Sequence, residues 1–382
     1  MSIAYKVKLN NPAVLTWARK EMGLEVHDIA DFFSKREAEI ISWEKGEDGP
    51  TFRQLESLAN KLKRPISAFF LPTVPPPTEP PEDHRTMPGI VPGKFTTKSR
   101  LAFRELRNML SETRELLDDL GQDISYSLPT WSMGNNPDQL ANTLRAEFGI
   151  TLEMQTKFDT HYAALDAWRD ILFDHGVIVR ICRMPIKDVR AFCLYGYDLA
   201  GIGLSSEERE HGRIFSLFHE VCHLCLSLPG VSGLTTKHRK GRQNPNQVLE
   251  QYCDQFAAAF LLPISDTNVR DSLRSLGNNF SLESAQRFAN HFKTSKYVVA
   301  RKAFDLGYIN NDLYWSEINR WTEEDKQRKS KSGGGDYNVT QVSHLGKRFV
   351  GLVFTAVNRG IITSVQASRL TGIKPLTIEA MR

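Results

Sequence analysis

Apolar residues recur at helical spacing through the first 71 residues of the chain. Because positions three and four residues apart share one face of a helix, this pattern predicts short amphipathic helices. Glycine and proline residues interrupt the pattern, and Ser34 and Thr51 are expected to cap the third and fourth helices. Short helices joined by tight turns are what a helix-turn-helix module requires. Residues 11–71 are therefore predicted to form an all-α domain.

A proline-rich segment, residues 72–98, follows this first domain. Its prolines are incompatible with a helix or a central strand, so we expect an extended spacer that acts as a passive tether. A charged amphipathic helix is expected next, over residues 99–120. Its apolar side is predicted to pack on the following domain. This side consists of Leu101, Leu106, Leu110, Leu116 and Leu117.

The pattern between residues 99 and 310 mixes strands with helices. Continuous apolar runs predict three strands of a small sheet, at residues 176–181, 191–195 and 199–204. Longer runs compatible with helices cover residues 207–226 and 248–262. Residues 227–246, between these two helices, are rich in Gly, Lys, Arg and Asn and are expected to form a mobile loop. A small sheet beside a helical body makes this region α+β.

The last part of the chain returns to amphipathic helices, over residues 340–382. A polar, basic segment that ends in three glycines precedes it and is expected to be a flexible linker, residues 326–335. The predicted fold is therefore mostly α with a small sheet. Its parts are an all-α N-terminal domain, a proline-rich linker, an α+β domain and a helical C-terminal region.

Composition places the chain among soluble globular proteins. Its 382 residues indicate two or three domains, and 41% hydrophobic with 25% charged residues is ordinary for such a protein. No apolar stretch reaches the roughly 20 residues needed to span a bilayer, and the N-terminus lacks a signal-peptide pattern. We therefore expect a cytoplasmic protein without a membrane partner. Five cysteines favour reduced thiols, and the net charge of +4 neither demands nor excludes nucleic acid.

The most informative chemical feature lies in the predicted helix 207–226, where residues 219–223 read His-Glu-Val-Cys-His. Residues four apart share a helix face, so His219 and His223 can offer their imidazoles to one metal ion. Glu220 lies beside them, where its carboxylate can take a proton from a water held at that metal.

The predicted helix 248–262 supplies the rest of the expected site. Glu250 can complete a set of three protein ligands, and Asp254, one turn later on the same face, can orient a ligand histidine. Three protein ligands with one open position form the catalytic arrangement of Zn²⁺. The two helices together predict a zinc hydrolase with Glu220 as its general base.

Several residues near the motif leave alternatives open. Cys222 and Cys225 form a C-x-x-C pattern without a second pair, so they are expected to be small buried residues, as is Cys253. A thiol beside zinc is nevertheless a point where oxidation or direct coordination can occur. The donor that amide hydrolysis needs for its oxyanion is left open among His211, His238 and Tyr252.

These segments resemble the ImmA/IrrE family of metallopeptidases. Residues 213–224 look like the family's segment around H-E-x-x-H, and residues 250–263 look like its E-x-x-A-[ND]-x-F-A-x-x-L-L-x-P segment. The resemblance implies a zincin-like domain that binds Zn²⁺. Cys253 stands where the family usually has Ala. Carried over to matching positions, the family's zinc ligands are His219, His223 and Glu250, its general base is Glu220, and Asp254 occupies its Asn/Asp position.

Residues 41–46, which read Ile-Ser-Trp-Glu-Lys-Gly, together with residues 50–51, 55, 58–59 and 69–71, resemble an XRE-type, lambda-repressor-like helix-turn-helix domain. Residues 23–30 depart from it because they lack the usual capping hydroxyl of the turn. The expected recognition helix opens with Lys35 and Arg36, which are expected to contact phosphates or base edges. Residues 1–75 contain 11 Lys and Arg against 10 Asp and Glu, which is little positive charge for a nucleic-acid binder. The domain is therefore expected either to dimerise on DNA or to recognise a protein.

Family members of known role cleave a helix-turn-helix repressor and so switch on stress, mobile-element or defence genes. The resemblance implies a zinc-dependent endopeptidase whose substrate is such a repressor, bound through domain pairing or through DNA shared with residues 11–71. One alternative is a DNA-binding transcriptional regulator whose peptidase-like domain is a sensor. Another is a component of a toxin–antitoxin-like pair. The intact Glu220 argues against a pure sensor, which needs no general base.

Overall fold

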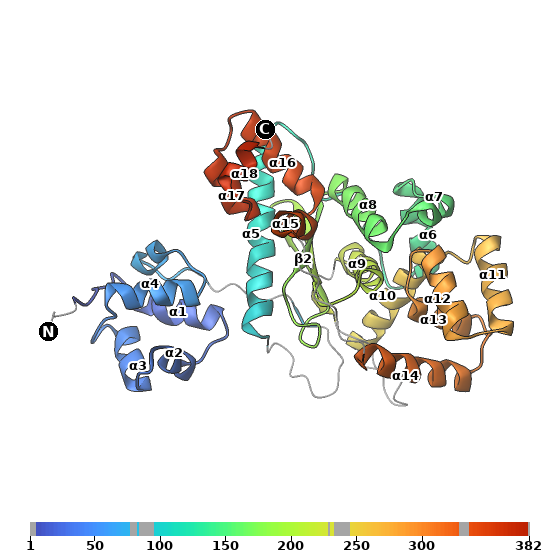
Figure 1. Ribbon diagram of the computed structural model, residues 1–382, viewed down its shortest axis with the longest axis horizontal. Helices are drawn as coiled ribbons and strands as arrows, with labels where there is room; N and C mark the ends of the chain where they lie inside the picture. Colours follow the sequence, from blue (N-terminus) through green and yellow to red (C-terminus); the bar gives the residue numbers. More distant parts are fainter. Residues whose placement is uncertain are drawn as a thin grey trace. The chain divides into compact units, whose positions relative to one another are not determined.

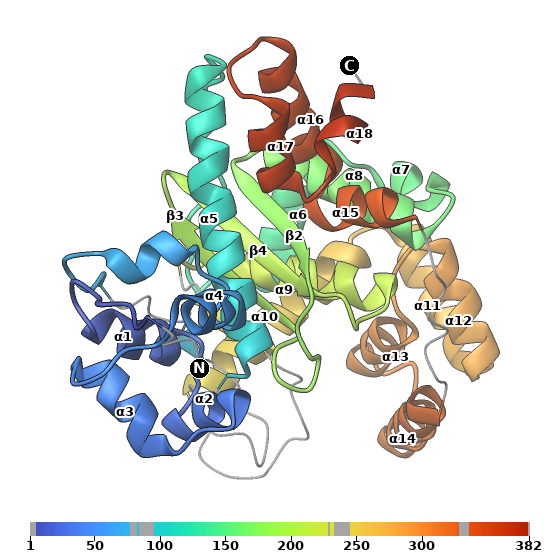
Figure 2. The ribbon, with the colours of Figure 1, turned by 60° about the vertical axis from the view of Figure 1, so that its left-hand side comes forward.

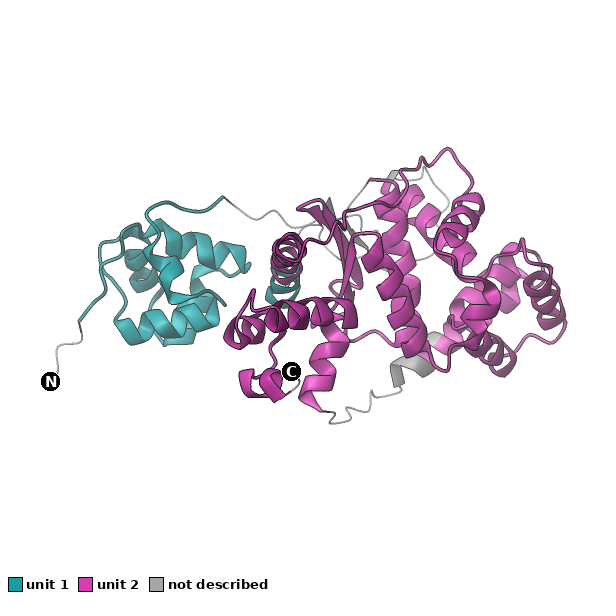
Figure 3. Ribbon diagram, turned by 90° about the horizontal axis from the view of Figure 1, so that it is seen from above, with its two compact units in different colours: residues 1–80, 93–104 teal, residues 81–92, 105–382 magenta. Residues whose placement is uncertain are grey.

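The computed structural model describes residues 5–76, 82–83, 95–227, 230–232, 245–327 and 336–380. These residues form mostly helices and one small sheet, as the hydrophobic pattern predicted (Figure 1). The chain divides into two compact units, residues 1–80 with 93–104 and residues 81–92 with 105–382 (Figure 3). The predicted loop and the two predicted linkers lie largely outside the described residues. None of the described helices combines the length and apolar character needed to cross a lipid bilayer.

Unit 1 contains short helices around one core. They are α1 (Ala13–Glu21), α2 (Val26–Phe33), α3 (Glu37–Lys45), α4 (Phe52–Lys61) and the 3₁₀ helix η1 (Ile66–Phe70). Their shared core includes the fully buried Leu55, Leu62 and Phe69.

The two predicted caps in unit 1 have different outcomes. Thr51 caps α4 as predicted, because its Oγ1 accepts a hydrogen bond of 3.3 Å from the backbone N–H of Gln54. The prediction for Ser34 was wrong. Ser34 ends α2 in the left-handed region, with a φ of 51°, and Arg36 takes the N-cap position of α3. The turn between the helices, residues 34–36, is thus longer than the sequence suggested, and the hydroxyl of Ser34 lies at the end of α2 instead of at the start of α3.

The long helix α5 (Thr97–Asp119) contains the boundary between the units, after Arg104. Four of the five leucines predicted to pack on the following domain do so, and the prediction was wrong for Leu101. Leu101 packs against the core of unit 1, whereas the other four are buried in unit 2. Leu106 meets the sheet at Gly201, where an added Cβ would lie 3.0 Å from the leucine side chain. Small residues in the strand therefore let α5 lie close against one sheet face.

The sheet has the strand order β1-β5-β3-β4-β2. Its main strands are β2 (Val177–Cys182), β3 (Ala191–Gly196) and β4 (Leu199–Ser205), and the short β1 (Glu82–Asp83) and β5 (Gly230–Ser232) extend one edge. β2 pairs with β4 in parallel, and β3 pairs with β4 antiparallel. All residues of β4 are buried, which explains why its sequence is a continuous apolar and small-residue run.

Gly176 fixes the entry into β2. Its φ is +71°, and an added Cβ would lie 2.3 Å from the carbonyl carbon of Ser125. Only glycine combines this left-handed backbone with so close an approach of another chain segment.

Unit 2 contains thirteen further helices among the described residues. They are α6 (Pro137–Glu147), α7 (Leu152–Lys157), α8 (His161–Asp174), α9 (Glu210–Cys225), α10 (Pro245–Leu261), α11 (Thr267–Asn278), α12 (Leu282–His291), α13 (Lys296–Asp305), α14 (Asn311–Gln327), α15 (Tyr337–Leu345), α16 (Lys347–Asn358), α17 (Ser364–Thr371) and α18 (Pro375–Ala380). Helix α9 packs against β3 and β4, and α10 packs against both α9 and α6 (Figure 2). The two helices with the chemical motifs are thus neighbours.

The C-terminal helices dock on the body of unit 2 through α15 and α16. The guanidinium of Arg169, buried on α8, donates to the backbone oxygens of Ser343 at 2.7 Å and His344 at 3.2 Å. The ammonium of Lys347 pairs with Asp166 at 2.9 Å. These polar contacts anchor the helices to α8, while α15 also contacts β2.

Glu112 on α5 gives the stability of this unit a measurable pH dependence. Burial raises its pKa from 4.5 to about 7, while nearby Arg180 opposes the shift and Glu115 adds to it. The folded chain therefore binds a proton at the Glu112 carboxyl more tightly than the unfolded chain does. This difference stabilises the folded state fully below pH 4.5, and the stabilisation is lost as the pH rises through about 7. Because the side chain is only partly buried, Glu112→Gln is expected to raise the free energy of unfolding at about pH 8 by on the order of 1 kcal/mol.

Urea denaturation at about pH 5 and about pH 8 measures this difference, and the gain from Glu112→Gln should be confined to the higher pH. An equal gain at both values would show that the shifted pKa is not its cause.

Candidate metal centre

The start of α9 is fixed to the end of β4. The guanidinium of Arg213 donates from Nε to the backbone oxygen of Ser205 at 3.0 Å, and from a terminal nitrogen to that of Ser206 at 2.7 Å. Ser216 donates to the buried carboxylate of Glu208 at 2.9 Å. The helix that carries the His-Glu-Val-Cys-His motif therefore begins at a defined place on the sheet.

The end of α9 is fixed by donors to its last carbonyls, which have no partner within the helix. The hydroxyls of Tyr126 and Tyr195 both donate to the backbone oxygen of Leu224, at 3.0 and 2.5 Å. The backbone N–H of Trp131 donates to the oxygen of Cys225 at 2.7 Å. With both ends held, the motif cannot slide along the helix axis.

A buried aromatic cluster joins α9 to α10 and α8. Phe218 stacks on Phe260 with ring centroids 3.9 Å apart, and Trp168 meets both rings edge-on at 5.0 and 5.2 Å. At the end of α10, Arg145 donates to the backbone oxygen of Phe260 and Gln155 donates to that of Leu261, at 2.7 and 2.9 Å. These contacts set the position of α10 beside α9.

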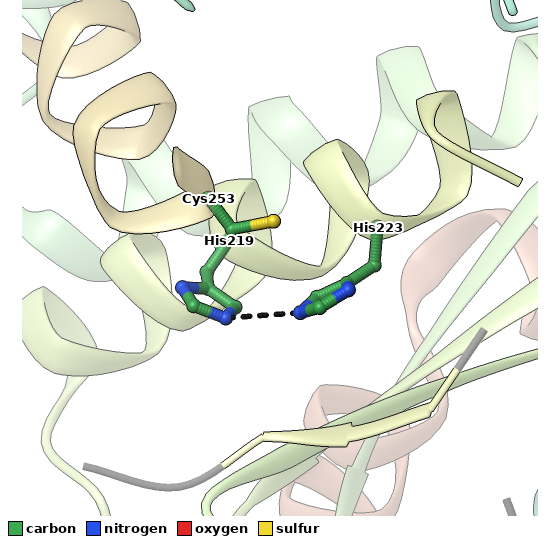
Figure 4. Close-up of side chains that lie close together, drawn as sticks. All are labelled: His219, His223 and Cys253. Carbon is green, nitrogen blue, oxygen red and sulfur yellow. Dashed lines mark hydrogen bonds between the residues drawn. The ribbon is translucent and has the colours of Figure 1, made fainter. Parts of the chain in front are cut away.

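The packing brings His219, His223 and Glu250 together, all of them buried. The Nε2 atoms of the two histidines lie 3.2 Å apart, and Figure 4 shows the two rings facing each other. One carboxylate oxygen of Glu250 lies 3.4 Å from Nε2 of His219, and the other lies 3.2 Å from Nε2 of His223. Two nitrogens and a carboxylate from two helices thus meet at one point.

These separations fit a tetrahedral zinc ion. With zinc–ligand bonds of about 2.0–2.1 Å, tetrahedral geometry places the ligand atoms about 3.3–3.4 Å from one another. The two Nε2 atoms lie 3.2 Å apart, and each has one Glu250 oxygen at a similar distance, Oε2 at 3.4 Å from His219 and Oε1 at 3.2 Å from His223. Two imidazoles and one carboxylate are also a donor set that zinc accepts, with one position left for water or substrate.

Asp254 orients one of the two histidines. Its Oδ1 lies 2.9 Å from Nδ1 of His219, so Nδ1–H donates to the carboxylate and Nε2 is turned toward Glu250 and His223. A carboxylate behind an imidazole raises its basicity and fixes the ring for metal binding.

The carboxylates of Asp254 and Glu250 make His219 more basic than an isolated imidazole. Burial by itself lowers the pKa of His219, but hydrogen bonds to Asp254 and Glu250 and their charges outweigh burial and raise that pKa well above 6.5. Burial raises the pKa of Glu250, but its hydrogen bonds to His219 and His223 outweigh burial and lower that pKa to about 2. The buried carboxylate is therefore ionised and balanced by a protonated imidazole.

Glu220 follows His219 directly on α9 and is fully buried. It is a second buried carboxylate on the helix that carries both histidines, and it is separate from the one that contacts them. A site with two carboxylates can use one to hold a cation and the other to move a proton.

The sulfur of Cys253 is a further possible ligand atom near the imidazoles. Ligand atoms of His219, His223 and Cys253 all lie within 4.8 Å of one another. The distances from Glu250 to the same imidazoles are shorter, at 3.2 and 3.4 Å, and match zinc geometry better. Burial and contact with Cys222 raise the pKa of Cys253 well above 9.0, so without a metal it stays a thiol. All five cysteines are free and buried, which agrees with the expected small apolar role.

Two of the three candidate oxyanion donors have contacts of their own in the structure. The hydroxyl of Tyr252 donates to the backbone oxygen of Asn135 at 3.0 Å, and the ring of His211 lies beside that of His161, with centroids 5.9 Å apart. His238 lies outside the described residues.

Lys35 and Arg36 precede α3 rather than open it, because that helix begins at Glu37. Both cations are engaged by Glu39. The ammonium of Lys35 donates to its carboxylate at 2.6 Å, and Nε of Arg36 lies 3.8 Å from it. The expected DNA contacts of unit 1 therefore have less free positive charge than the sequence suggested.

Comparison with known proteins supports a peptidase assignment for the central part of the chain. No curated protein and no solved structure matches the chain. One peptidase family model, described as the IrrE N-terminal-like domain, matches residues 173–304, about a third of the chain. The match covers β2 to β4, α9 and α10, whereas the helices of unit 1 lie outside it. Residues 173–304 are thus similar to the IrrE N-terminal-like domain of a metallopeptidase family.

Proposed function

We propose that this protein is a zinc-dependent peptidase whose metal ligands are His219, His223 and Glu250. The observation that carries the proposal is the meeting of two buried imidazoles and one buried carboxylate, in which each Nε2 has a carboxylate oxygen at 3.2 or 3.4 Å, a donor set that zinc accepts. The peptidase family match over the same residues supports the reaction class.

Each polar residue of the centre then has its own task. Bound zinc would supply a Lewis acid that polarises a peptide carbonyl and makes a nearby water more acidic. Glu220 takes the proton from the attacking water and passes it to the leaving amine. Asp254 keeps Nε2 of His219 directed at the metal by accepting the hydrogen bond from Nδ1.

We propose a helix-turn-helix repressor as the substrate, on the resemblance described above, with cleavage releasing the genes that it controls. Unit 1 would recognise this repressor by domain pairing. Two observations favour a protein partner over DNA for unit 1: Glu39 engages Lys35 and Arg36, and the aromatic side chains of Phe32 and Phe52 are exposed. Exposed aromatic residues are typical anchors of protein–protein contacts.

The zinc content of ligand variants tests the metal centre. The zinc-loaded chain is expected to retain one zinc ion per chain after dialysis. Glu250→Gln should lose most of it, because a neutral amide is a poorer ligand than a carboxylate. Cys253→Ala should keep it. Elemental analysis by mass spectrometry measures the metal, and circular dichroism checks that each variant is folded. The opposite pattern, in which only Cys253→Ala loses its zinc, would make the Cys253 thiol the third ligand.

Removal of the general base should separate metal binding from catalysis. Glu220→Gln is expected to retain zinc and to cleave its substrate roughly 100- to 10,000-fold more slowly. Glu210→Gln makes the same chemical change at the start of α9 and should leave the rate unchanged. The assay is cleavage, with and without DNA, of a repressor encoded beside this protein, followed by mass spectrometry of the products. A zinc-loaded wild-type chain that leaves the repressor intact in every condition would refute this choice of substrate.

Asp254→Asn tests the role of the carboxylate behind His219. The loss of its negative charge is expected to weaken zinc binding by roughly 10- to 100-fold, while the fold is kept. Competition with a chromophoric chelator measures this affinity. Unchanged affinity would mean that Asp254 does not tune the ligand.

A further inference from the structure

The C-terminal helices α17 and α18 form a helix–turn–helix arrangement that the sequence pattern did not single out. α17 ends at Thr371, the turn consists of residues 372–374, and α18 begins at Pro375. Gly372 has a φ of +72°, which is the left-handed conformation that reverses the chain after a helix. A three-residue turn that begins with such a glycine is characteristic of the helix-turn-helix motif.

The turn is fixed by its own hydrogen bonds and by a small core. Oγ1 of Thr371 donates to the backbone oxygen of Ala367 at 2.8 Å and accepts from the N–H of Ile373 at 3.2 Å. Ala367, Ile373 and Ile378 are fully buried, α17 packs on α16, and α18 packs on α17. The small side chain of Ala367 lets the second helix approach the first. The two helices therefore hold a defined mutual position.

The exposed side of this pair has two cations, Arg369 and Lys374, and one carboxylate, Glu379, which accepts a hydrogen bond from Ser364 at 2.7 Å. Residues 336–380 contain five Lys and Arg against two Asp and Glu. Lys347 and Arg348 pair with acidic residues of α8. Arg359, Arg369 and Lys374 are exposed, and none of them forms an ion pair with another residue of the described ranges. This distinguishes the C-terminal helices from unit 1, where the two expected DNA-contacting cations are engaged by Glu39.

Helix spacing places these charges on the outer side. Arg369 lies on the face of α17 opposite Ala367 and Thr371, which are buried. Lys374 is exposed at the end of the turn, directly before α18, and Leu376 in the first turn of α18 is 80% exposed. In helix-turn-helix proteins, the first residues of the second helix contact base edges, and nearby cations contact phosphates.

We propose that α17 and α18 are a double-stranded DNA-binding module of this protein, with α18 as the helix that enters the major groove. Arg369 and Lys374 contact phosphates, and Leu376 contacts the apolar part of the base edges, such as a thymine methyl group. The anchoring of α15 and α16 on α8 keeps this module attached to the body of unit 2. The proposal is independent of the metal centre and of the peptidase function.

Charge reversal in the full-length chain tests the proposal. The probe is a mixed-sequence DNA duplex of about 30 base pairs, and its binding is measured by fluorescence anisotropy from about 50 to 200 mM salt. Arg369→Glu with Lys374→Glu is expected to weaken binding at low salt by roughly tenfold or more, and to lower the slope of log affinity against log salt by about 2.

Two matched variants serve as controls. Arg270→Glu with Arg274→Glu makes the same charge change at exposed positions of α11, which Figures 1 and 2 both show apart from α17. Lys35→Glu with Arg36→Glu makes the same charge change in unit 1. Both should change binding much less than the C-terminal variant. Unchanged far-ultraviolet circular dichroism verifies that the variants are folded.

Photo-crosslinking distinguishes DNA from a protein partner. A benzoylphenylalanine residue in place of Leu376 is expected to crosslink to the duplex, whereas the same residue in place of the exposed Met154 on α7 should not. No binding of the duplex by the full-length chain, or equal loss in the C-terminal and α11 variants, would overturn the proposal. Crosslinks from position 376 to protein alone would also overturn it, in favour of a protein-docking surface.

Discussion

The close packing of α9 against α10 is the constraint on which the candidate metal centre depends. Neither helix holds a metal-binding set alone, because His219 and His223 lie on one and Glu250 lies on the other. Cys253 and Ala257, four residues apart on α10, are fully buried in the core that it shares with α9, and such small side chains allow the helix axes to approach. The stacked rings of Phe218 and Phe260 then fix the offset along the axes. A shift of about one ångström would take the carboxylate out of reach of the imidazoles.

This packing places a buried negative charge that needs a positive partner. Glu250 is ionised, and an isolated carboxylate in the interior is costly. The raised pKa of His219, which Asp254 contacts on its other side, lets a protonated imidazole balance this charge. A bound divalent cation would balance the same carboxylate with more charge. A cation held by these residues, as proposed, would explain why polar residues lie in a core that is otherwise apolar.

Charge is distributed differently at the two helical ends of the chain. In unit 1, Lys35 and Arg36 interact with Glu39, and exposed aromatic side chains are available for a protein partner. In the C-terminal helices, three exposed cations have no acidic partner among the described residues. If both proposals hold, unit 1 selects the substrate and the C-terminal helices bind DNA. A peptidase held on DNA would meet a DNA-bound repressor at a raised local concentration.

The sequence by itself determined the local elements and the residues that share a helix face. Continuous apolar runs located β2, β3, β4, α9 and α10 to within a few residues, because burial on both sides requires such runs. Helix spacing placed His219 with His223 and Glu250 with Asp254. Only the tertiary structure decided that the carboxylate of Glu250 meets both imidazoles, that Asp254 contacts His219, and that α17 and α18 form an outward-facing pair. The reason is physical: spacing along a helix fixes its own faces, whereas the rotation and offset between helices are set by distant contacts such as those of Arg145 and Phe260.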